Sequence, residues 1–226
     1  MLTAAQSWPL FFDSTFGSNM NSIVDIAAVS KDVPTKFGAE WEGGYFGGIL
    51  TFGGDVYGQV ISPKALGDIG PAIWHSDYTL ITGADSFFDG LGNTKAMAEA
   101  GSEIAQQVLE LRINGRDDWH IGSRDQVELM YRGLKPTTDE NDVYRYGDNP
   151  SSLPPGYPYT LHLPGQTEVE LFRDGCAEAF EATWYFTSTQ YSANSAWGQG
   201  FDDGTQTIAG KYGRGRFRAV RMIKIL

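Results

Sequence analysis

The stretch YFTSTQYSANSAWGQGFDDG, residues 185–204, has the residue types best suited to binding a ligand. It places flat aromatic rings beside short amide, hydroxyl and carboxylate groups, a mixture typical of recognition surfaces because such side chains lose little entropy on ordering. Alternate aromatic residues on a strand usually face a core, so we expect the tryptophans to form a scaffold and the loop residues to make contact. The predicted ligand-binding residues are Gln190, Tyr191, Asn194, Asp202, Asp203, Lys211, Tyr212 and Arg214.

These residues belong to three predicted loops that would form the rim of a binding surface. The loops are residues 190–194, the Asp202-Asp203 turn and residues 211–214. We expect the tyrosines of this set to stack on a ligand and the amides to hydrogen-bond to it, while Lys211 and Arg214 pair with anionic groups. The alternative location is the polar, proline-rich insertion at residues 135–166, because structureless segments of that length are usually functional or mobile.

Side chains that commonly carry catalysis form no recognised pattern in this sequence. His75, His120 and His162 are far apart, and none belongs to the i, i+4 pair of a helical zinc site, so each is interpreted as a hydrogen-bonded structural residue. Ser188 and Ser195 lack the glycines of a nucleophile elbow. The sequence therefore predicts a binding protein and not an enzyme.

No cofactor or metal site is predicted. The acidic run DEND at residues 139–142 supplies oxygen atoms but lacks the glycine-spaced pattern of a calcium loop, so it is interpreted as a solvated loop. The glycine run at residues 43–54 has no phosphate-loop lysine and precedes no predicted helix. A single cysteine, Cys176, excludes an internal disulfide and a multi-cysteine zinc site.

Two groups of strands are expected to position the binding loops. An early hairpin has strands at residues 45–52 and 56–62, joined by the turn Gly53-Gly54-Asp55, and the glycines inside these strands suggest bulges. In the C-terminal part, Asp203-Gly204 provides another hairpin turn. The strands expected there span residues 183–189, 195–201, 205–209 and 215–225.

Two amphipathic helices are predicted between these groups of strands. The first is capped at residues 93–94 and runs to about Arg112. The second follows a short strand at residues 119–121, with Ser123 as its N-cap and Gln126 completing a capping box. The remaining segments are expected to be loops, chiefly residues 68–92 and 135–166.

Composition limits the class of protein. The chain has 226 residues, of which 41% are hydrophobic, which is enough for one large globular domain, and its 28 glycines and 10 prolines favour many turns and mixed α and β structure. A net charge of -11 argues against a nucleic-acid partner, because such a partner requires an attractive field toward phosphates. We expect an α+β fold in which residues 1–42 form an N-terminal arm or docking segment and residues 43–226 form one domain.

The sequence also predicts no membrane insertion. No segment reaches the roughly 20 apolar residues that a membrane-spanning helix needs, and the first residues lack the basic start of a signal peptide. We therefore expect synthesis in a cytoplasm and exit by another route, such as assembly into a particle. Residues 204–226 contain no carboxylate and are locally basic, which we interpret as a strand whose cations face water or pair with acidic residues elsewhere.

Two motifs resemble those of the Lcl C-terminal-like domain family. They are DDWHIGSRDQVELMY at residues 117–131 and WYFTSTQYSANSAWGQGFDDGTQTIAGKYGRGRFRAVR at residues 184–221, in the order found in that family. With the early hairpin, the resemblance covers residues 43–221. The sequence departs from the family at Gly122, where proline is frequent, and at Phe186, where tryptophan is frequent.

This resemblance implies a C-type-lectin-like fold. Such a fold has two helices flanking a twisted antiparallel sheet, chain ends brought close together, and a ligand face built from the C-terminal strands and their connections. The calcium-site signatures of sugar-binding C-type lectins are missing here, so calcium-dependent sugar binding is not implied. Proteins of this family occur as adhesive domains of bacterial surface proteins and as tail-fibre or tail-tip proteins of bacteriophages.

The function that the resemblance implies is host attachment by a bacteriophage. The chain would be a tail-fibre or tail-tip protein of the virion, made in the host cytoplasm, with a lectin-like face for a host cell-surface glycan or protein. Its other partners would be phage tail proteins and further copies of itself, with a trimer favoured, because multivalence turns weak contacts into avidity. Two alternatives remain open: a structural baseplate or decoration subunit that binds other virion proteins, and a bacterial surface adhesin domain.

Overall fold

The computed structural model describes residues 32–144 and 146–226 and shows a mixed α/β protein with one large sheet. The strands β1, β2, β3, β9, β6, β7 and β8 follow one another across the sheet, and β4 and β5 both pair with β9. The strands are β1 (Glu40–Trp41), β2 (Gly44–Phe52), β3 (Asp55–Ile61), β4 (Asp68–Ile73), β5 (His120–Ile121), β6 (Trp184–Gln190), β7 (Ser195–Gly200), β8 (Gln206–Gly210) and β9 (Arg214–Lys224).

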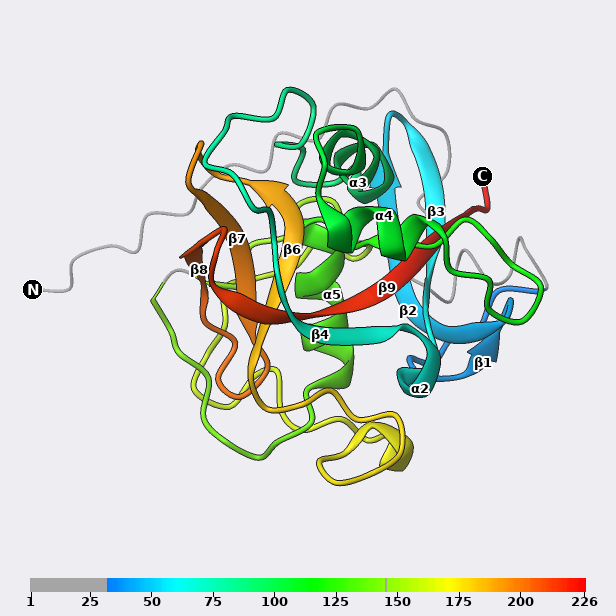
Figure 1. Ribbon diagram of the computed structural model, residues 1–226. Helices are drawn as coiled ribbons and strands as arrows, with labels where there is room; N and C mark the ends of the chain where they lie inside the picture. The colour runs from blue at the N-terminus through cyan, green and yellow to red at the C-terminus, as the bar shows by residue number, and fades with distance from the viewer. Residues whose placement is uncertain (1–31, 145) are drawn as a thin grey trace, which may run out of the picture.

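Strand β9 holds the two halves of the sheet together. It runs antiparallel to β3, with Tyr57 opposite Lys224, and it meets β6 in parallel, with Tyr185 opposite Arg216. In Figure 1 it crosses the middle of the molecule as the red strand. The early hairpin and the C-terminal strands predicted from the sequence are therefore confirmed, and the C-terminal strand joins them into one sheet.

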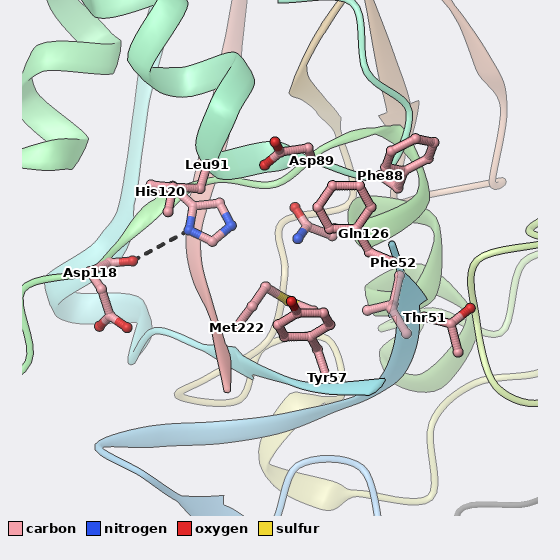
Figure 2. A pocket seen from close by; sticks show the side chains of 11 residues that line it. Thr51, Phe52, Tyr57, Phe88, Asp89, Leu91, Asp118, His120, Gln126 and Met222 are labelled. Carbon is pink, nitrogen blue, oxygen red and sulfur yellow. Dashed lines mark hydrogen bonds between the residues drawn. The ribbon is translucent and has the colours of Figure 1, made fainter. Parts of the chain in front are cut away.

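The helices lie against this sheet from two directions. Helices α3 and α4 contact β5, and α3 also contacts β6, whereas α5 contacts β2, β6 and β7 (Figure 1). The start of α3, strand β5 and the β2–β3 hairpin together enclose a pocket of about 200 Å³ (Figure 2). The helical segments are α2 (Lys64–Gly67), α3 (Gly90–Glu99), α4 (Glu103–Leu109), α5 (Arg124–Leu134) and the 3-10 turn Glu170–Phe172. Within the described residues, no helix has the length and apolar character needed to cross a membrane.

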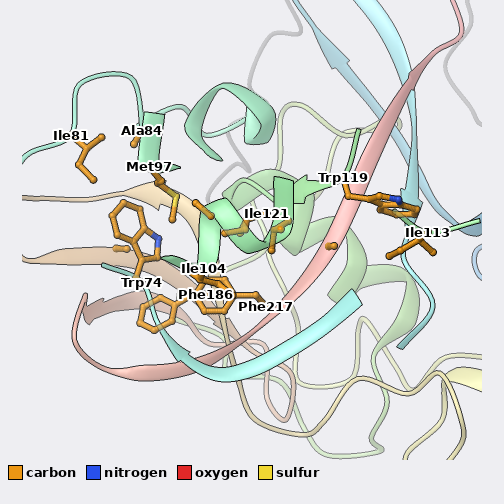
Figure 3. Close-up of a cluster of buried hydrophobic side chains, with 14 of the residues drawn as sticks. Trp74, Ile81, Ala84, Met97, Ile104, Ile113, Trp119, Ile121, Phe186 and Phe217 are labelled. Carbon is orange, nitrogen blue, oxygen red and sulfur yellow. The ribbon is translucent and has the colours of Figure 1, made fainter. Parts of the chain in front are cut away.

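Alternation along β9 and β6 separates two hydrophobic cores, because successive side chains of a strand point to opposite faces. Phe217 and Phe186 face α3 and α4, whereas Val220 and Tyr185 belong to the cluster on the α5 side. Figure 3 shows the first core, in which Trp74 lies among side chains from the helices and strands around it. The second core is rich in aromatic side chains and contains Met130, Tyr131, Tyr159, Phe172, Phe180 and Phe201.

Helix α5 begins as its sequence predicts. The Ser123 hydroxyl accepts the Gln126 backbone N–H, and the side-chain Oε1 of Gln126 accepts the Ser123 backbone N–H at 2.8 Å, which completes the capping box. The first predicted helix is instead two helices, α3 and α4, broken at Gly101, whose φ is 97°. Its cap is also further upstream than predicted, since the carboxylate of Asp89 accepts the Gly92 N–H at 2.8 Å.

The glycines of the early hairpin explain its turn and its irregularity. Gly53 and Gly54 have φ values of 61° and 88°, which suit a two-residue turn that follows the twist of the flanking strands. The register of β2 against β3 shifts between Phe46 and Ile49, where Gly48 has a φ of 102°. The bulge expected from these glycines is confirmed. Residues 68–73, by contrast, were predicted to be a loop and form strand β4, which pairs with β9.

The insertion at residues 135–166 has no helix or named strand in its described part, as predicted, yet it is tied firmly to the protein. Asn141 is buried, and its amide nitrogen donates to the carbonyls of Thr160 and Pro164, both at 2.9 Å. Asn149, also buried, donates to Glu128 of α5 at 2.6 Å. Side chains from α5 and amides within the insertion thus take the place of a hydrogen-bonded ladder.

The predicted N-terminal arm, residues 1–42, lies mainly outside the described residues. Its last part packs on the domain: Val33 is buried and joins a core cluster with Phe46 and Ile49, and β1 pairs with β2. Residues 33–42 therefore extend the sheet and its packing.

Candidate functional site: an aromatic groove beside strands β7 and β8

A groove of about 310 Å³ lies where α5, the insertion and the strands β7 and β8 meet. Two hydrogen bonds hold these parts together. Arg124, at the start of α5, donates its backbone N–H to the Thr189 hydroxyl of β6, and Gly147 of the insertion donates its N–H to the Gln206 side chain. We call this feature the aromatic groove. It is lined by Arg124, Tyr144, Tyr146, Tyr191, Trp197, Gln206, Thr207 and Ile208.

Aromatic rings form the walls of the groove. The Tyr191 ring is 58% exposed and meets Trp197 edge to face, with 5.7 Å between the ring centroids. On the side of the insertion, Tyr144 is 71% exposed and packs against Tyr146 at 6.2 Å. Exposed rings held by a second ring offer a large, rigid contact area to a ligand at little entropic cost.

Two buried nitrogen atoms at the groove have no hydrogen-bond partner. Arg124 stacks between Phe87 and Trp197, at 4.9 and 5.3 Å from the ring centroids, and its Nη1 pairs with Asp125 at 3.2 Å. Its Nε remains without an acceptor. Gln206 accepts the Gly147 N–H with Oε1 at 2.9 Å, and its Nε2 also lacks an acceptor. Buried polar atoms are normally paired, so these two donors suit a ligand rich in acceptor oxygens.

The arrangement can bind, but it offers little for proton transfer. Among the eight groove residues, all in the described part of the chain, there is no carboxylate, imidazole or thiol. A ligand that complements the groove presents an apolar face to the rings and oxygen atoms to Arg124 and Gln206. A sugar with a carboxylate or another anionic substituent has this chemistry, because charged acceptors bind guanidinium N–H groups most strongly.

Four of the other predicted contact residues lie at the surface outside the groove lining. Asn194 is exposed in the β6–β7 loop, where its Oδ1 accepts the Ser192 hydroxyl at 2.7 Å. Asp202 is exposed at the β7–β8 turn. Tyr212 packs edge to face on Tyr78 at 4.5 Å, and Arg214 donates to the Pro71 carbonyl at 3.2 Å. Of the predicted set, Tyr191 alone lines the groove.

Asp203 serves the turn itself. Its side chain is partly exposed, and its Oδ1 accepts the Thr205 N–H at 2.9 Å. Its backbone carbonyl accepts the Asp142 N–H at 2.8 Å, which ties the turn to the insertion. The two predicted locations for the site, the C-terminal loops and the insertion, are therefore neighbours in space.

Gln190 and Lys211 lie in the interior, although the sequence assigns both to contact loops. Gln190 is the last residue of β6 and is 4% exposed, and Lys211 is 0% exposed. The ammonium of Lys211 donates to Gln190 Oε1 at 2.6 Å and to the Thr79 carbonyl at 2.7 Å, over the ring of Trp74. These two polar side chains bind each other, so they are not open to a surface ligand.

Lys211 is expected to make stability depend on pH. Burial lowers the pKa of its ammonium to about 8, whereas an unfolded lysine titrates at about 10.4. Between these values the unfolded chain binds more protons, so the free energy of unfolding contributed by this group rises with pH, from about 8 upward. Urea unfolding from pH 8 to about 9.5, below the usual tyrosine pKa, should show this rise in the wild type relative to Lys211→Met. If the difference in the free energy of unfolding between the wild type and Lys211→Met stayed constant over this pH range, the expectation would be contradicted.

The groove residues that the sequence did not identify are Arg124, the tyrosines of the insertion, and Gln206, Thr207 and Ile208 of β8. In the sequence, Arg124 has the features of an ordinary residue in the first turn of a capped helix, and Gln206 has those of a strand residue that follows a turn. The aromatic content of the insertion was the one available signal. Trp197, interpreted as scaffold, is both scaffold and wall, since it supports Tyr191 and Arg124.

The histidines differ from one another in the structure. His75 has both ring nitrogens bonded, to the Ala100 carbonyl at 3.0 Å and the Asp77 N–H at 2.9 Å, which confirms the structural interpretation. His162 is exposed, and His120 is buried with one ring nitrogen unpartnered. Within residues 32–144 and 146–226, no group of three histidine, cysteine or carboxylate residues is placed to hold a metal ion.

Comparison of the sequence with known proteins finds no matching family model and no matching curated protein. The function of the chain is therefore inferred from the geometry of the groove and from the sequence motifs.

Proposed function

We propose that this chain is a bacteriophage tail-fibre or tail-tip protein whose lectin-like face recognises a glycan or protein on the host cell surface. The observation that carries the binding role is the aromatic groove, with its exposed rings and the unpartnered donors of Arg124 and Gln206. The virion assignment depends on the two sequence motifs that resemble Lcl C-terminal-like domains.

The topology supports a C-type-lectin-like arrangement within this proposal. The early β2–β3 hairpin pairs with the C-terminal strand β9, so that the two ends of the domain are adjacent in one sheet. The long connections lie between them, and α3 and α5 contact strands from different parts of the sheet. The groove is formed next to β7 and β8, where the resemblance places a ligand face.

The chemistry of the groove favours an oxygen-rich and partly anionic ligand. The guanidinium of Arg124 is held by two aromatic rings and keeps Nε free, and Gln206 adds a second donor. One such site of modest affinity gives firm attachment when several copies act together, which is why a trimeric assembly fits this function.

Tyr191→Ala is expected to weaken binding of the purified protein to host cells at least about tenfold, which corresponds to about 1.4 kcal/mol, because it removes a rigid exposed wall of the groove. The measurement is binding to a panel of intact bacteria and to a glycan array that includes acidic sugars. Arg124→Gln should reduce binding to acidic glycans in particular, since it removes the charge and keeps a polar side chain.

The matched control is Tyr157→Ala. Tyr157 is similarly exposed, at 52%, but it does not line the groove. Retained binding in this variant, together with loss in Tyr191→Ala, would support the proposal. Equal loss of binding in both variants would contradict the proposal, and so would the absence of binding to any cell or glycan. If the protein binds nothing and the phage tail fails to assemble without it, a structural subunit would be favoured.

A further inference from the structure

A second pocket, which shares no lining residue with the aromatic groove, contains the buried side chain of His120. This pocket has a volume of about 200 Å³, and we call it the His120 pocket. Figure 2 shows its residues, which come from β2, β3, β5, β9 and the starts of α3 and α5. They are Leu50, Thr51, Phe52, Tyr57, Phe88, Asp89, Leu91, Asp118, His120, Gln126 and Met222.

The imidazole of His120 presents a hydrogen-bond acceptor to this pocket. The side chain is 1% exposed, and its Nδ1 lies 3.4 Å from the Asp118 carbonyl, which as an acceptor places the proton on Nδ1. The Nε2 atom therefore carries a lone pair, and it has no partner within the described structure. In Figure 2 this second nitrogen points away from Asp118, toward the side chain of Gln126. Burial also lowers the pKa of His120 to about 4, so the ring is neutral at physiological pH.

The carboxylates near His120 are already engaged. Asp118 makes a bidentate ion pair with Arg221, at 2.5 and 3.1 Å, and Asp89 caps α3 through the Gly92 N–H. Gln126 Oε1 is likewise held by the Ser123 N–H. The imidazole is therefore the lining group left with an unmet acceptor, and a buried acceptor without a donor is unfavourable.

The walls around this acceptor are apolar and aromatic. Phe52 and Phe88 form a pair with 4.9 Å between ring centroids and are 38% and 43% exposed, so they stand at the mouth of the pocket. Leu50 and Met222 contribute aliphatic surface deeper in the lining. An engineered cavity of about 150 Å³ with apolar walls is known to bind benzene, so the His120 pocket has room for one aromatic ring.

We propose that the His120 pocket binds a small aromatic compound carrying one O–H or N–H donor, which hydrogen-bonds to His120 Nε2 while its ring packs against Phe52 and Phe88. The site is separate from the aromatic groove, and this inference does not depend on the proposed function. Its two requirements, a ring-sized apolar space and a single donor, define the ligand class.

Phenol and toluene test these requirements in the wild-type protein, because they have similar shapes and differ in the donor. Titrations at matched concentrations, up to the solubility limit of toluene, are followed by NMR, including the imidazole ¹⁵N signals of His120. Phenol should bind about tenfold more tightly than toluene, the effect of one net hydrogen bond, and should shift the Nε2 signal. Saturable binding of phenol with no change at Nε2, equal affinity for toluene, or no binding of either compound would each overturn the proposal.

Two variants locate the binding. Phe88→Ala opens the mouth of the pocket at a partly exposed position and should weaken the binding of both compounds. His120→Leu keeps the volume of the side chain and removes the acceptor, so it should weaken the binding of phenol and leave the binding of toluene unchanged. Unfolding of His120→Leu would be recognised by its spectrum, and the wild-type ¹⁵N titration then still decides the proposal. The groove variant Tyr191→Ala serves as the control and should bind phenol as the wild type does.

Discussion

Arg218→Met is expected to lower the free energy of unfolding by about 3–5 kcal/mol, the usual effect of removing one partner from a buried ion pair. The Arg218 side chain has no exposed surface, and its guanidinium donates to Glu178 at 2.8 Å, to Asp68 at 3.3 Å and to the Ser62 carbonyl at 2.9 Å. Methionine fills similar space but leaves the carboxylates of Asp68 and Glu178 without this guanidinium. Urea unfolding followed by tryptophan fluorescence measures the loss.

Arg216→Met on the same strand is the matched control for this prediction. Arg216 pairs with Asp68 at 2.9 Å, but its side chain is 23% exposed, and Asp68 would keep Arg218 as a partner. We expect a loss of about 1 kcal/mol or less. Equal losses in the two variants would mean that burial does not decide the strength of this cluster.

The cluster explains how β9 joins parts of the chain that are distant in sequence. Asp68 begins β4 and also accepts the hydroxyl of Tyr185 from β6 at 2.8 Å. Glu178 accepts the backbone N–H of Lys64 at 2.6 Å. A double-mutant cycle between Arg218 and Glu178 should give a coupling energy within about 0.5–3 kcal/mol, because the two side chains are in direct contact.

The sequence was sufficient for those elements whose signals are local. The capping box of Ser123 and Gln126, the Gly53-Gly54 turn and the alternating strands of the C-terminal part each depend on neighbours within a few residues, and each was confirmed. The break between α3 and α4 is also local, since Gly101 occupies a positive φ, but an amphipathic pattern continues across it and suggested one helix. Strand β4 had no such signal, because its pairing with β9 comes from tertiary structure.

The candidate site could be predicted only in part, for a related reason. Residue type made Tyr191 a candidate contact residue, and Tyr191 does line the groove. Residue type could not show that the side chains of Gln190 and Lys211 hydrogen-bond to each other in the interior. Arg124 and Gln206 became candidates through what they lack, a hydrogen-bond partner, and this is visible only after every neighbour has been placed. Whether a side chain is buried, and whether its polar atoms find hydrogen-bond partners, depends on the packed structure. Neither property follows from the spacing of residues in the sequence.

Glu128→Ala is expected to lower the free energy of unfolding by about 3–5 kcal/mol and to loosen the insertion as well. The Glu128 side chain is buried in α5 and accepts from Arg132 Nε at 2.9 Å, from the Tyr159 hydroxyl at 2.8 Å and from Asn149 at 2.6 Å. Alanine would leave the largely buried guanidinium of Arg132 without its carboxylate, and it would remove the hydrogen bonds from Tyr159 and Asn149 of the insertion to α5.

The second effect connects the interior to the groove. The insertion supplies Tyr144 and Tyr146, and Arg132 also donates to the Gly147 and Tyr157 carbonyls, at 2.5 and 2.8 Å. If Arg132 loses Glu128, we expect faster amide exchange across residues 146–160 and weaker ligand binding at the groove, although no groove residue has been changed. Glu140→Ala, at an exposed position of the same insertion, should change stability by no more than about 0.5 kcal/mol. Unchanged amide exchange in Glu128→Ala, with a loss of stability alone, would show that the bonds internal to the insertion are enough to hold this wall of the groove in place.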